Sequence, residues 1–295
     1  MLFPSPDSVI DHDLGGGHSQ RAIFRGKCDW LDQAASNRCV EFTNRANCSR
    51  KTGCRRTGGN LSVLSERIKS AKQFALFAEV APAELELIIG AAREKRFDRR
   101  ETIFSEGDPV RHVTMVVSGI VKVTQMGLNG NEVILRLNAA GEIVGSYRVC
   151  VNCSHCATAQ AVQPCVALVW EAAAFEKLLA RIPTFRRNTV RALEERLLEM
   201  EQRFREVSTE KVGSRLSSEL VRLSDRLRRC TENGLLEITL SRAELAQLTG
   251  TTLFTVSRLL CQWQTQGIVR VRRESVLVQD FAALAQISQA EERSA

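Results

Sequence analysis

The chain has 295 residues, enough for two ordinary domains of roughly 100–200 residues each. Hydrophobic residues make up 44% and charged residues 25%, so the composition excludes a chain disordered throughout, a collagen and a coiled-coil rod. No apolar run approaches the roughly 20 residues of a membrane span, and the first residues lack the basic stretch and apolar core of a signal peptide. We therefore expect a soluble, cytoplasmic protein with no membrane partner.

The charge and the cysteine content narrow the function only slightly. Lysine and arginine number 41 against 34 aspartate and glutamate, which gives a net charge of +7 and weakly favours a polyanionic partner. The chain holds ten cysteines but no export signal. We therefore expect metal binding, redox sensing or core packing rather than a disulfide framework.

The first 60 residues differ from the rest of the chain. They contain the glycine runs at 15–17 and 58–59 and no sustained apolar period, so we predict that residues 1–60 form a disordered extension. From Leu61 to Arg96 the apolar residues recur at helical spacing. Pro82 stands where a second helix would start, because proline is favoured at the first position of a helix.

Short β-runs separated by glycine turns follow, from Phe97 to Trp170. The runs lie at 102–104, 113–117, 120–124, 133–137 and 166–169, and turns such as Ser118-Gly119 and Asn129-Gly130 close them. Strands at this spacing predict a small antiparallel barrel or jelly roll. We place a sensor domain at residues 61–182.

A long helix is predicted at residues 183–208, after Pro183. Its apolar positions are separated by steps of 3, 4, 3, 4 and 3, and charged residues flank them. This seam is typical of a two-helix coiled coil, although a helix packed against its own barrel is the alternative. We favour a homodimer in which the seam residues are Val190, Leu193, Leu197, Met200, Phe204 and Val207.

Residues 209–284 are predicted to form a DNA-binding module, followed by a tail at 285–295. Ser241 and Glu244 form a capping box at the start of a short helix, and Thr249-Gly250-Thr251 ends it. A second helix and a basic hairpin around Arg272-Arg273 follow, which together are typical of a winged helix-turn-helix. An ordinary helical hairpin with a strand pair is the alternative. The candidate DNA-contacting residues are Ser241, Thr251, Thr252, Phe254, Ser257, Arg258, Arg272 and Arg273.

The chain from about Gln73 to Leu284 resembles the Crp/Fnr superfamily of bacterial transcription regulators. The motifs that carry this resemblance occur in order along the chain: IFSEGD at 103–108, SGIVK at 118–122, GEIVG at 141–145, LTG at 248–250 and TVSRLL at 255–260. The resemblance implies an α+β protein with a cyclic-nucleotide-binding-type antiparallel β-roll, a long dimerisation helix and a C-terminal winged helix-turn-helix. RNA polymerase is then an expected partner.

The effector pocket of the family departs from its usual pattern here. Members that bind cyclic AMP hold its phosphate with an Arg-Ser pair after a Gly-Glu turn, because a buried anion needs a guanidinium or a backbone nest opposite it. Gly141-Glu142 is present, but the segment where Arg-Ser should stand has no arginine, and Arg148 lies a few residues early. Cyclic AMP is therefore disfavoured as the effector.

That segment instead carries closely spaced cysteines. Cys150, Cys153 and Cys156 are spaced C-x2-C-x2-C, with Cys165 further on. This spacing occurs among the ligands of bacterial-type iron–sulfur clusters, and with His155 nearby zinc is a second option. Thiol redox sensing and simple packing of small apolar thiols remain alternatives, and Cys165 before a strand fits packing. The cofactor stays unknown at this point.

The iron–sulfur cluster of the oxygen-sensing branch of the family is not expected in this chain, because the cysteine ligands of that branch are not matched here. Its ligands are closely spaced N-terminal cysteines and one in the roll, whereas no two of Cys28, Cys39, Cys48 and Cys54 are spaced C-x2-C. Trp170 stands where that branch places its roll ligand. Haem has no better support, because His112 and His155 are isolated in the sequence.

These observations predict a homodimeric, sequence-specific DNA-binding transcription regulator controlled by an unidentified effector or by a redox or metal signal at the roll. A cyclic-nucleotide-responsive regulator or receptor module is the alternative. The sequence contains no P-loop, G-x-S-x-G, H-E-x-x-H or G-x-G-x-x-G motif, so we do not expect an enzyme.

Overall fold

The computed structural model describes residues 59–128, 130–145, 153–227 and 235–289. All of them belong to one compact unit, 55–295. Almost all of the predicted N-terminal extension, and Arg148, Cys150 and the four N-terminal cysteines, lie outside the described residues. None of the helices that the structure describes is long and apolar enough to cross a lipid bilayer.

Helices precede the first sheet, as the periodicity predicts, but the helical region ends earlier than expected. Pro82 is indeed the first residue of a helix. The prediction of helix up to Arg96 is wrong, because residues 93–97 pair with a strand some 70 residues further along the chain. Such long-range pairing overrides local helix propensity. The elements here are α1 (Gly59–Ala71), the 3-10 helix η2 (Ala75–Phe77), α2 (Pro82–Gly90) and β1 (Arg93–Phe97).

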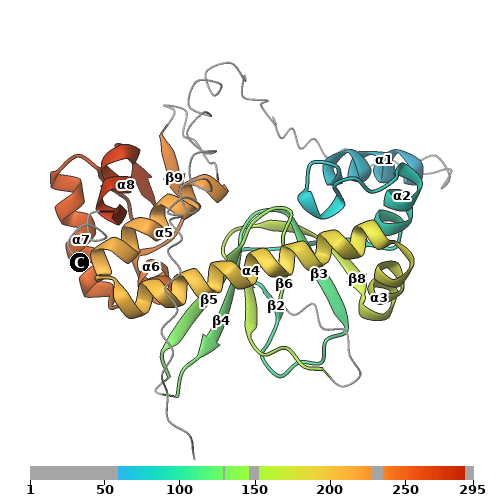
Figure 1. Ribbon diagram of the computed structural model, residues 1–295, viewed down its shortest axis with the longest axis horizontal. Coiled ribbons are helices and arrows are strands. Elements are labelled where there is room, and N and C mark those ends of the chain that lie inside the picture. The colour runs from blue at the N-terminus through green and yellow to red at the C-terminus, as the bar shows by residue number, and fades with distance from the viewer. Residues whose placement is uncertain (1–58, 129, 146–152, 228–234, 290–295) are drawn as a thin grey trace, which may run out of the picture. The chain divides into compact units, whose positions relative to one another are not determined.

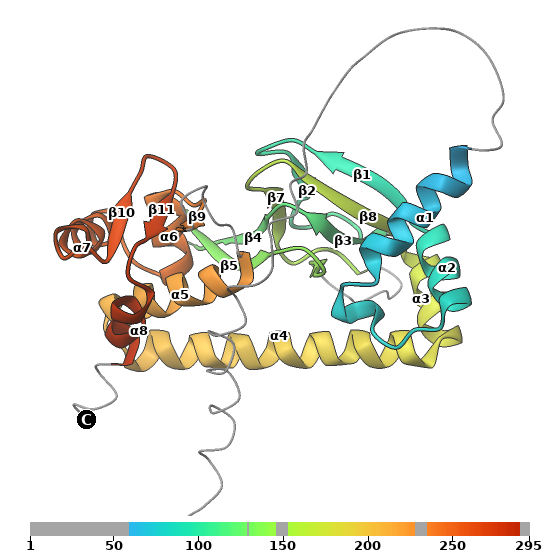
Figure 2. The ribbon, with the colours of Figure 1, turned by 90° about the horizontal axis from the view of Figure 1, so that it is seen from above.

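The predicted roll is confirmed as two four-stranded antiparallel sheets (Figures 1 and 2). One sheet has the order β1-β8-β3-β6 and the other β2-β7-β4-β5. The second ends in β5, which is therefore an edge strand. The strands are β2 (Thr102–Phe104), β3 (His112–Ser118), β4 (Val121–Met126), β5 (Glu132–Asn138), β6 (Ile143–Val144), β7 (Thr158–Ala161) and β8 (Cys165–Glu171).

Two apolar clusters hold this part together. Small and branched side chains such as Val116, Val123 and Ala159 fill the interior of the roll. On the other face of β3 and β8, Trp170 packs against Phe175 of α3 (Ala172–Arg181) with ring centroids 5.6 Å apart. The indole N–H of Trp170 donates to the carbonyl of Ile88 at 2.8 Å, so its polar atom is satisfied in the core.

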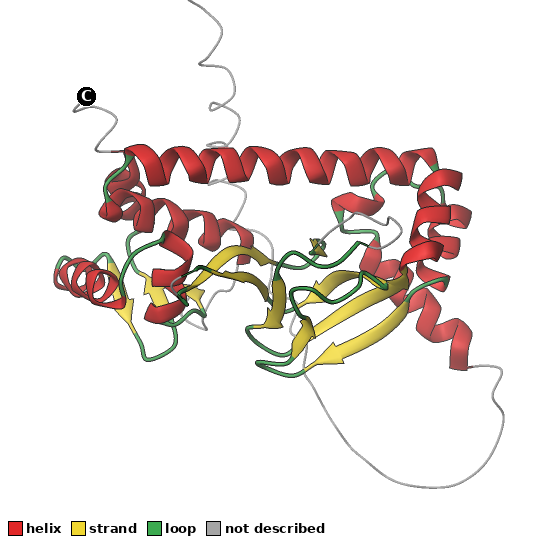
Figure 3. Ribbon diagram, turned by 90° about the horizontal axis from the view of Figure 1, so that it is seen from below, coloured by secondary structure: helices red, strands yellow, loops and turns green. Residues whose placement is uncertain are grey.

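The long helix is confirmed as α4 (Pro183–Thr209), and it lies along the unit in Figure 3. Its N-terminal end is anchored, because Asn188 donates to the carbonyls of Leu76 and Ala78. The six seam residues lie open instead, from 38% exposed at Leu193 to 76% at Phe204. The seam thus does not pack against its own roll, which rules out the alternative explanation of its spacing.

The C-terminal module folds as predicted, with two additions. Residues 242–249 and 253–265 form the two short helices, and the basic hairpin is joined by a third strand. The predicted tail is wrong in part: a helix continues to Gln289 and packs on α5, where the hydroxyl of Ser217 donates to the carbonyl of Leu284. The elements are α5 (Val212–Leu227), β9 (Leu236–Ile238), α6 (Arg242–Thr249), α7 (Leu253–Thr265), β10 (Val269–Val271), β11 (Val276–Val278) and α8 (Phe281–Gln289).

A glycine between β3 and β4 provides a test of how the roll is packed. Gly119 has φ +96°, and a Cβ there would lie 2.5 Å from the Cβ of Cys165 and 2.7 Å from the carbonyl oxygen of Pro164. We expect Gly119→Ala to lower the free energy of unfolding by at least about 2 kcal/mol in urea titrations, because it combines backbone strain with overpacking.

Gly130 is the matched control. It also has a positive φ (+77°), but a Cβ there would meet nothing within 4 Å. Gly130→Ala should therefore lower the free energy of unfolding by only about 1 kcal/mol, because it adds backbone strain without a steric clash. Equal losses in the two variants would mean that the contact with Cys165 is not tight.

Candidate DNA-binding site and sensory cavities

The first helix of the helix-turn-helix, α6, is fixed at both ends. Ser241 caps it: the backbone N–H of Glu244 donates to the Ser241 hydroxyl at 3.2 Å, and the carboxylate of Glu244 accepts from the Ser241 backbone at 2.8 Å. Gly250 ends the helix in the left-handed conformation with φ +62°, which favours glycine. The predicted capping box and turn are confirmed, and the Ser241 hydroxyl is occupied by the cap.

The second helix, α7, has one buried face and one exposed face. Val256 and Leu260 are completely buried, whereas Phe254 is 79% exposed and Arg258 is exposed. Ser257 is half-buried between them. The structure therefore brings these three predicted residues together on one outward stripe.

The threonines before α7 have a different role from the stripe. The hydroxyl of Thr252 accepts from the backbone N–H of Thr255 at 3.1 Å and so caps the helix. Thr251 is half-buried beside it. These residues set where α7 begins, which is at the same end as Phe254.

Sequence reasoning did not single out several exposed residues of α7, three of which lie near Phe254 and Arg258 in the sequence. Leu253 is 52% exposed, and Cys261 and Gln262 are exposed one turn beyond Arg258. Helical spacing could have found the last two, since they stand three and four residues after Arg258.

The wing carries the two predicted arginines at its tip. The backbone N–H of Arg272 donates to the carbonyl of Ser275 at 2.8 Å and closes the turn between β10 and β11. The side chains of Arg272 and Arg273 are exposed. Arg272 lies 3.6 Å from the carboxylate of Glu237, which belongs to the neighbouring strand β9.

A largely buried group of charges joins the long helix to the C-terminal module. Arg222 of α5 lies 2.7 Å from Glu206 of α4 and 2.6 Å from Glu219, and Arg203 of α4 lies 3.3 Å from Glu219. We call these four residues the α4–α5 ion cluster. Burial works against the charge of Glu206, but the hydrogen bonds and charge of Arg222 outweigh it and hold its pKa below the usual value.

Arginines also cover the edge strand of the roll. Arg203 donates to the carbonyl of Leu135 at 2.8 Å, and Arg226 of α5 donates to the carbonyl of Leu137 at 3.0 Å. Alternate carbonyls of an edge strand point away from the sheet and need such donors. The two helices are therefore held to β5 through its backbone.

Glu142, a predicted effector residue, is held by partners within the chain. Its carboxylate accepts from Arg226 at 2.5 Å and from the backbone N–H of Ala139 at 3.3 Å. Gly141 lies against Phe74, where a Cβ would be 2.8 Å from the ring. A cavity of about 390 Å³ opens beside them, and α4, α5 and η2 complete its lining.

A second cavity, of about 370 Å³, lies in the roll. His155 and Phe104 line it and stack with ring centroids 3.6 Å apart. Gly145 lies against the same phenylalanine, and Arg196 of α4 donates to the Gly145 carbonyl at 2.6 Å. The sequence had suggested His155 as a possible zinc ligand and as too isolated for haem, and had included Phe104 only as part of the IFSEGD motif; it did not predict that the two rings stack.

His155 is a buried group whose surroundings disfavour its charged form. It is 6% exposed, and its Nδ1 has no hydrogen-bond partner among the described residues. Burial lowers the pKa of His155 despite the nearby charge of Asp108. The uncharged imidazole is therefore the form that the fold favours.

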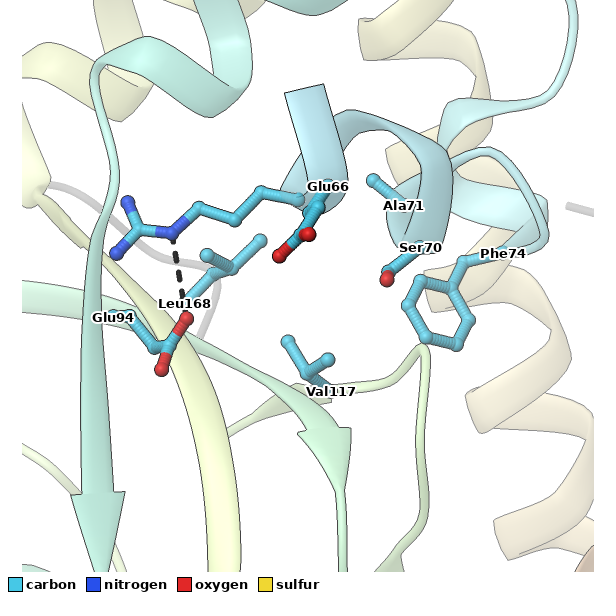
Figure 4. A pocket seen from close by; sticks show the side chains of 8 residues that line it. Glu66, Ser70, Ala71, Phe74, Glu94, Val117 and Leu168 are labelled. Carbon is cyan, nitrogen blue, oxygen red and sulfur yellow. Dashed lines mark ion pairs between the residues drawn. The ribbon is translucent and has the colours of Figure 1, made fainter. Parts of the chain in front are cut away.

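A third, smaller cavity of about 190 Å³ lies between α1 and the sheet of order β1-β8-β3-β6 (Figure 4). The Arg67 guanidinium and the Glu94 carboxylate form an ion pair at 3.3 Å on its rim, while Phe74 and Leu168 line it. It contains none of the predicted site residues.

The predicted metal-binding cysteines are in part separated. Cys165 is buried in the roll core, where burial raises the pKa of its thiol to about 11, whereas Cys156 is exposed. Cys153 is disulfide-bonded, and Cys150 lies outside the described residues. Among the residues with described positions, no three His, Cys, Asp or Glu side chains are grouped to hold a metal ion. The packing interpretation of Cys165 agrees with its burial.

Comparisons with known proteins match both halves of the chain. Residues 94–182 match the cyclic nucleotide-binding domain, and residues 214–287 match the Crp-like helix-turn-helix domain. The chain is 29% identical over 214 residues to the cyclic AMP receptor protein of Thermus thermophilus, which covers 72% of this chain and 96% of that protein. It is 24% identical over 200 residues to the fumarate and nitrate reduction regulatory protein of Escherichia coli, which covers 66% and 78%.

Solved structures show the same fold. A transcriptional regulator of the CRP/FNR family from Thermus thermophilus superposes with a TM-score of 0.58 at 20% identity, over 67% of this chain and 98% of that one. A structure from Bradyrhizobium japonicum, FixK2, gives 0.58 at 22% identity over 66% and 96%.

The α4–α5 ion cluster generates a pH-dependent stability prediction. We expect Arg222→Ala to lower the free energy of unfolding at pH 7 by about 3 kcal/mol, because it leaves Glu206 and Glu219 charged and buried. In the wild type the pKa of Glu206 is depressed, so its stabilisation is present above the unfolded value and is lost as the pH falls through the folded value. The gap between variant and wild type should therefore shrink below about pH 4.3.

Urea titrations at pH 7 and pH 4 measure this gap. Arg187→Ala is the control. The side chains of Arg187 and Glu79, which form an ion pair, are 58% and 78% exposed. Removing this pair should lower the free energy of unfolding by less than about 1 kcal/mol at either pH. A gap for Arg222→Ala that is the same at both pH values would contradict the assignment.

Proposed function

The chain belongs to the Crp/Fnr family of DNA-binding transcription regulators, and we propose that it acts as a homodimer that reads its operator with α7. The observation that carries the proposal is the outward stripe of α7. Phe254 and Arg258 are exposed on this stripe, while the opposite face of α7 is buried and packs against α6. A helix held in this way can enter the major groove with its first residues toward the bases.

The outward residues define a base-reading surface. Arg258 fits guanine, because a guanidinium donates two hydrogen bonds to O6 and N7. Family members commonly carry a glutamate near the start of this helix that accepts from cytosine, where this chain has Phe254. A phenyl ring cannot accept that bond but can contact a thymine methyl. We therefore infer an operator that keeps the guanine and differs at the neighbouring base pair.

The seam of α4 supports the dimer. Its six apolar residues are all exposed in the single chain, and contiguous apolar surface of this kind marks an interface. A second copy of α4 would bury the seam and place two recognition helices on one duplex. The relatives are regulators, so an enzymatic role is not proposed.

The signal that controls the protein is proposed to be something other than cyclic AMP. A buried phosphate needs a charged guanidinium or a backbone nest, but residues 150–159 contain no arginine, and Arg148 lies a few residues early in the sequence. His155 lies in this segment, but burial lowers its pKa and so disfavours the charged imidazolium that would pair with a phosphate. The roll cavity beside His155 and Phe104 is the candidate site for a different effector.

The dimer prediction uses the centre of the seam. Leu197, 58% exposed in the single chain, should become buried between two copies of α4. We expect Leu197→Asp to give monomers in sedimentation and to lose operator binding at the same time, because two buried carboxylates would face each other. Wild-type protein that sediments as a monomer under the same conditions would refute the dimer.

The base-reading prediction uses selection from a randomised half-site. Arg258→Ala should flatten the preference at one G·C pair by about 1–3 kcal/mol, and Phe254→Glu should shift a neighbouring preference toward cytosine. Arg272→Ala or Arg273→Ala should instead weaken binding evenly across sequences and reduce its salt dependence.

The same selection shows whether α7 is placed correctly. If Arg258→Ala selects the same sites with the same information content as the wild type, Arg258 contacts phosphate rather than a base.

A further inference from the structure

The helix α7 begins with two large apolar side chains that the fold does not bury. Leu253 and Phe254 are its first two residues, and they are 52% and 79% exposed. Neither belongs to the apolar cluster of the C-terminal module, which takes Val256 and Leu260 from the same helix. Adjoining apolar side chains left in water mark a surface that a partner covers.

The backbone that carries the pair is held on both sides. The backbone N–H of Thr251 donates to the carbonyl of Ala246 in α6 at 3.0 Å. Thr252 then caps α7: its hydroxyl accepts from the N–H of Thr255 at 3.1 Å, and its carbonyl accepts from the N–H of Val256 at 3.1 Å. The exposed pair is therefore presented at a fixed point rather than on a loose loop.

The charges around the pair are suited to a polyanion. From Leu245 to Arg273 the chain has no aspartate or glutamate. The start of a helix adds a partial positive charge of its own. The same stretch carries four arginines, all of them exposed: Arg258, Arg270, Arg272 and Arg273. An apolar pair within a positive surface fits the major groove of DNA, where phosphates flank the base edges.

The chemistry of the two side chains limits what they can read in that groove. Cytosine presents an amino donor there, whereas thymine presents a carbonyl acceptor and a C5-methyl group. Leu253 and Phe254 have no hydrogen-bonding group, so they cannot distinguish the donor from the acceptor, but they can pack on the methyl. In 5-methylcytosine the methyl group is on the same ring carbon as in thymine. The feature that the pair can recognise is therefore a methylated pyrimidine.

We propose that Leu253 and Phe254 form a methyl-reading patch, which contacts C5-methyl groups of pyrimidines in the operator and makes binding sensitive to cytosine methylation. This inference rests on the proposed function, because α7 must first lie in the major groove. The first residues of a recognition helix are the ones that contact base edges. Arg258 follows Phe254 by four residues and so lies on the same side of α7. The operator thus combines a guanine with methylated pyrimidines beside it.

The first test removes single methyl groups from the DNA. In the selected operator, each thymine beside the G·C pair that depends on Arg258 is replaced by deoxyuridine, which lacks only the methyl. Wild-type protein should bind about fourfold more weakly for each contacted methyl, the equivalent of about 0.8 kcal/mol for one buried carbon. Leu253→Ala/Phe254→Ala should bind both duplexes equally. It should keep the preference for the G·C pair, which shows that α7 is still folded and in the groove.

The second test adds methyl groups. At the same positions, duplexes with cytosine and with 5-methylcytosine are compared, each base being paired with guanine. Wild-type protein should bind the methylated duplex about fourfold more tightly, because the methyl restores the apolar contact. Leu253→Ala/Phe254→Ala should not distinguish the two duplexes.

Leu87→Ala is the matched control. Leu87 is another exposed leucine, 44% exposed on α2, which lies at the opposite end of the described unit from α7 in Figures 1 and 2. Its replacement should leave the response to every methyl group as in the wild type. Deoxyuridine placed outside the half-sites should change the affinity of none of the proteins.

Four results would overturn the proposal. The selected half-sites contain no thymine beside the guanine, or wild type binds the thymine and deoxyuridine duplexes equally. A methyl effect of the same size persists in Leu253→Ala/Phe254→Ala, which means that the methyl acts through the shape of the DNA. That variant binds every duplex as the wild type does but no longer regulates transcription, which means that the pair contacts a protein. Failure of the proposed function is distinct, because wild type would then select no operator from random DNA.

Discussion

The arrangement of the described unit depends on the unpaired edge of β5. An edge strand leaves alternate carbonyls without partners, and water or a side-chain donor has to satisfy them. Arg203 of α4 and Arg226 of α5 do so at Leu135 and Leu137. Both arginines also pair with glutamates of the opposite helix, at 3.3 Å to Glu219 and 2.7 Å to Glu199. One set of guanidinium groups thus connects the sensor, the long helix and the DNA-binding module.

This connection gives a physical route from the sensor to the operator. The turn at Gly141-Glu142 is joined to α5 by Arg226, and the cavity of about 390 Å³ beside it has walls from the roll, α4 and α5. The carbonyl of Gly145, next to the stacked Phe104 and His155, is joined to α4 by Arg196. A change in either place acts on charged groups that are largely buried, where electrostatic interactions are less screened than at the surface. An effector bound at either place would therefore act on the helices that position α7.

The DNA-binding surface combines sequence reading with phosphate binding. The stripe at Phe254 and Arg258 can contact base edges, whereas the exposed arginines of the wing can contact phosphates, which position the protein without reading sequence.

The sequence by itself determined the order of the modules, the two short helices of the C-terminal module and the apolar seam of α4, because each of these follows from a local pattern of residues. The capping box at Ser241, the left-handed Gly250 and the 3/4 spacing from Val190 to Val207 need only neighbouring residues to be interpreted. Only the tertiary structure decided that residues 93–97 are a strand, that α8 covers α5, that His155 is buried on Phe104 and that Arg226 joins Glu142. Each of these depends on partners far apart in the chain, and long-range pairing and burial override local propensity.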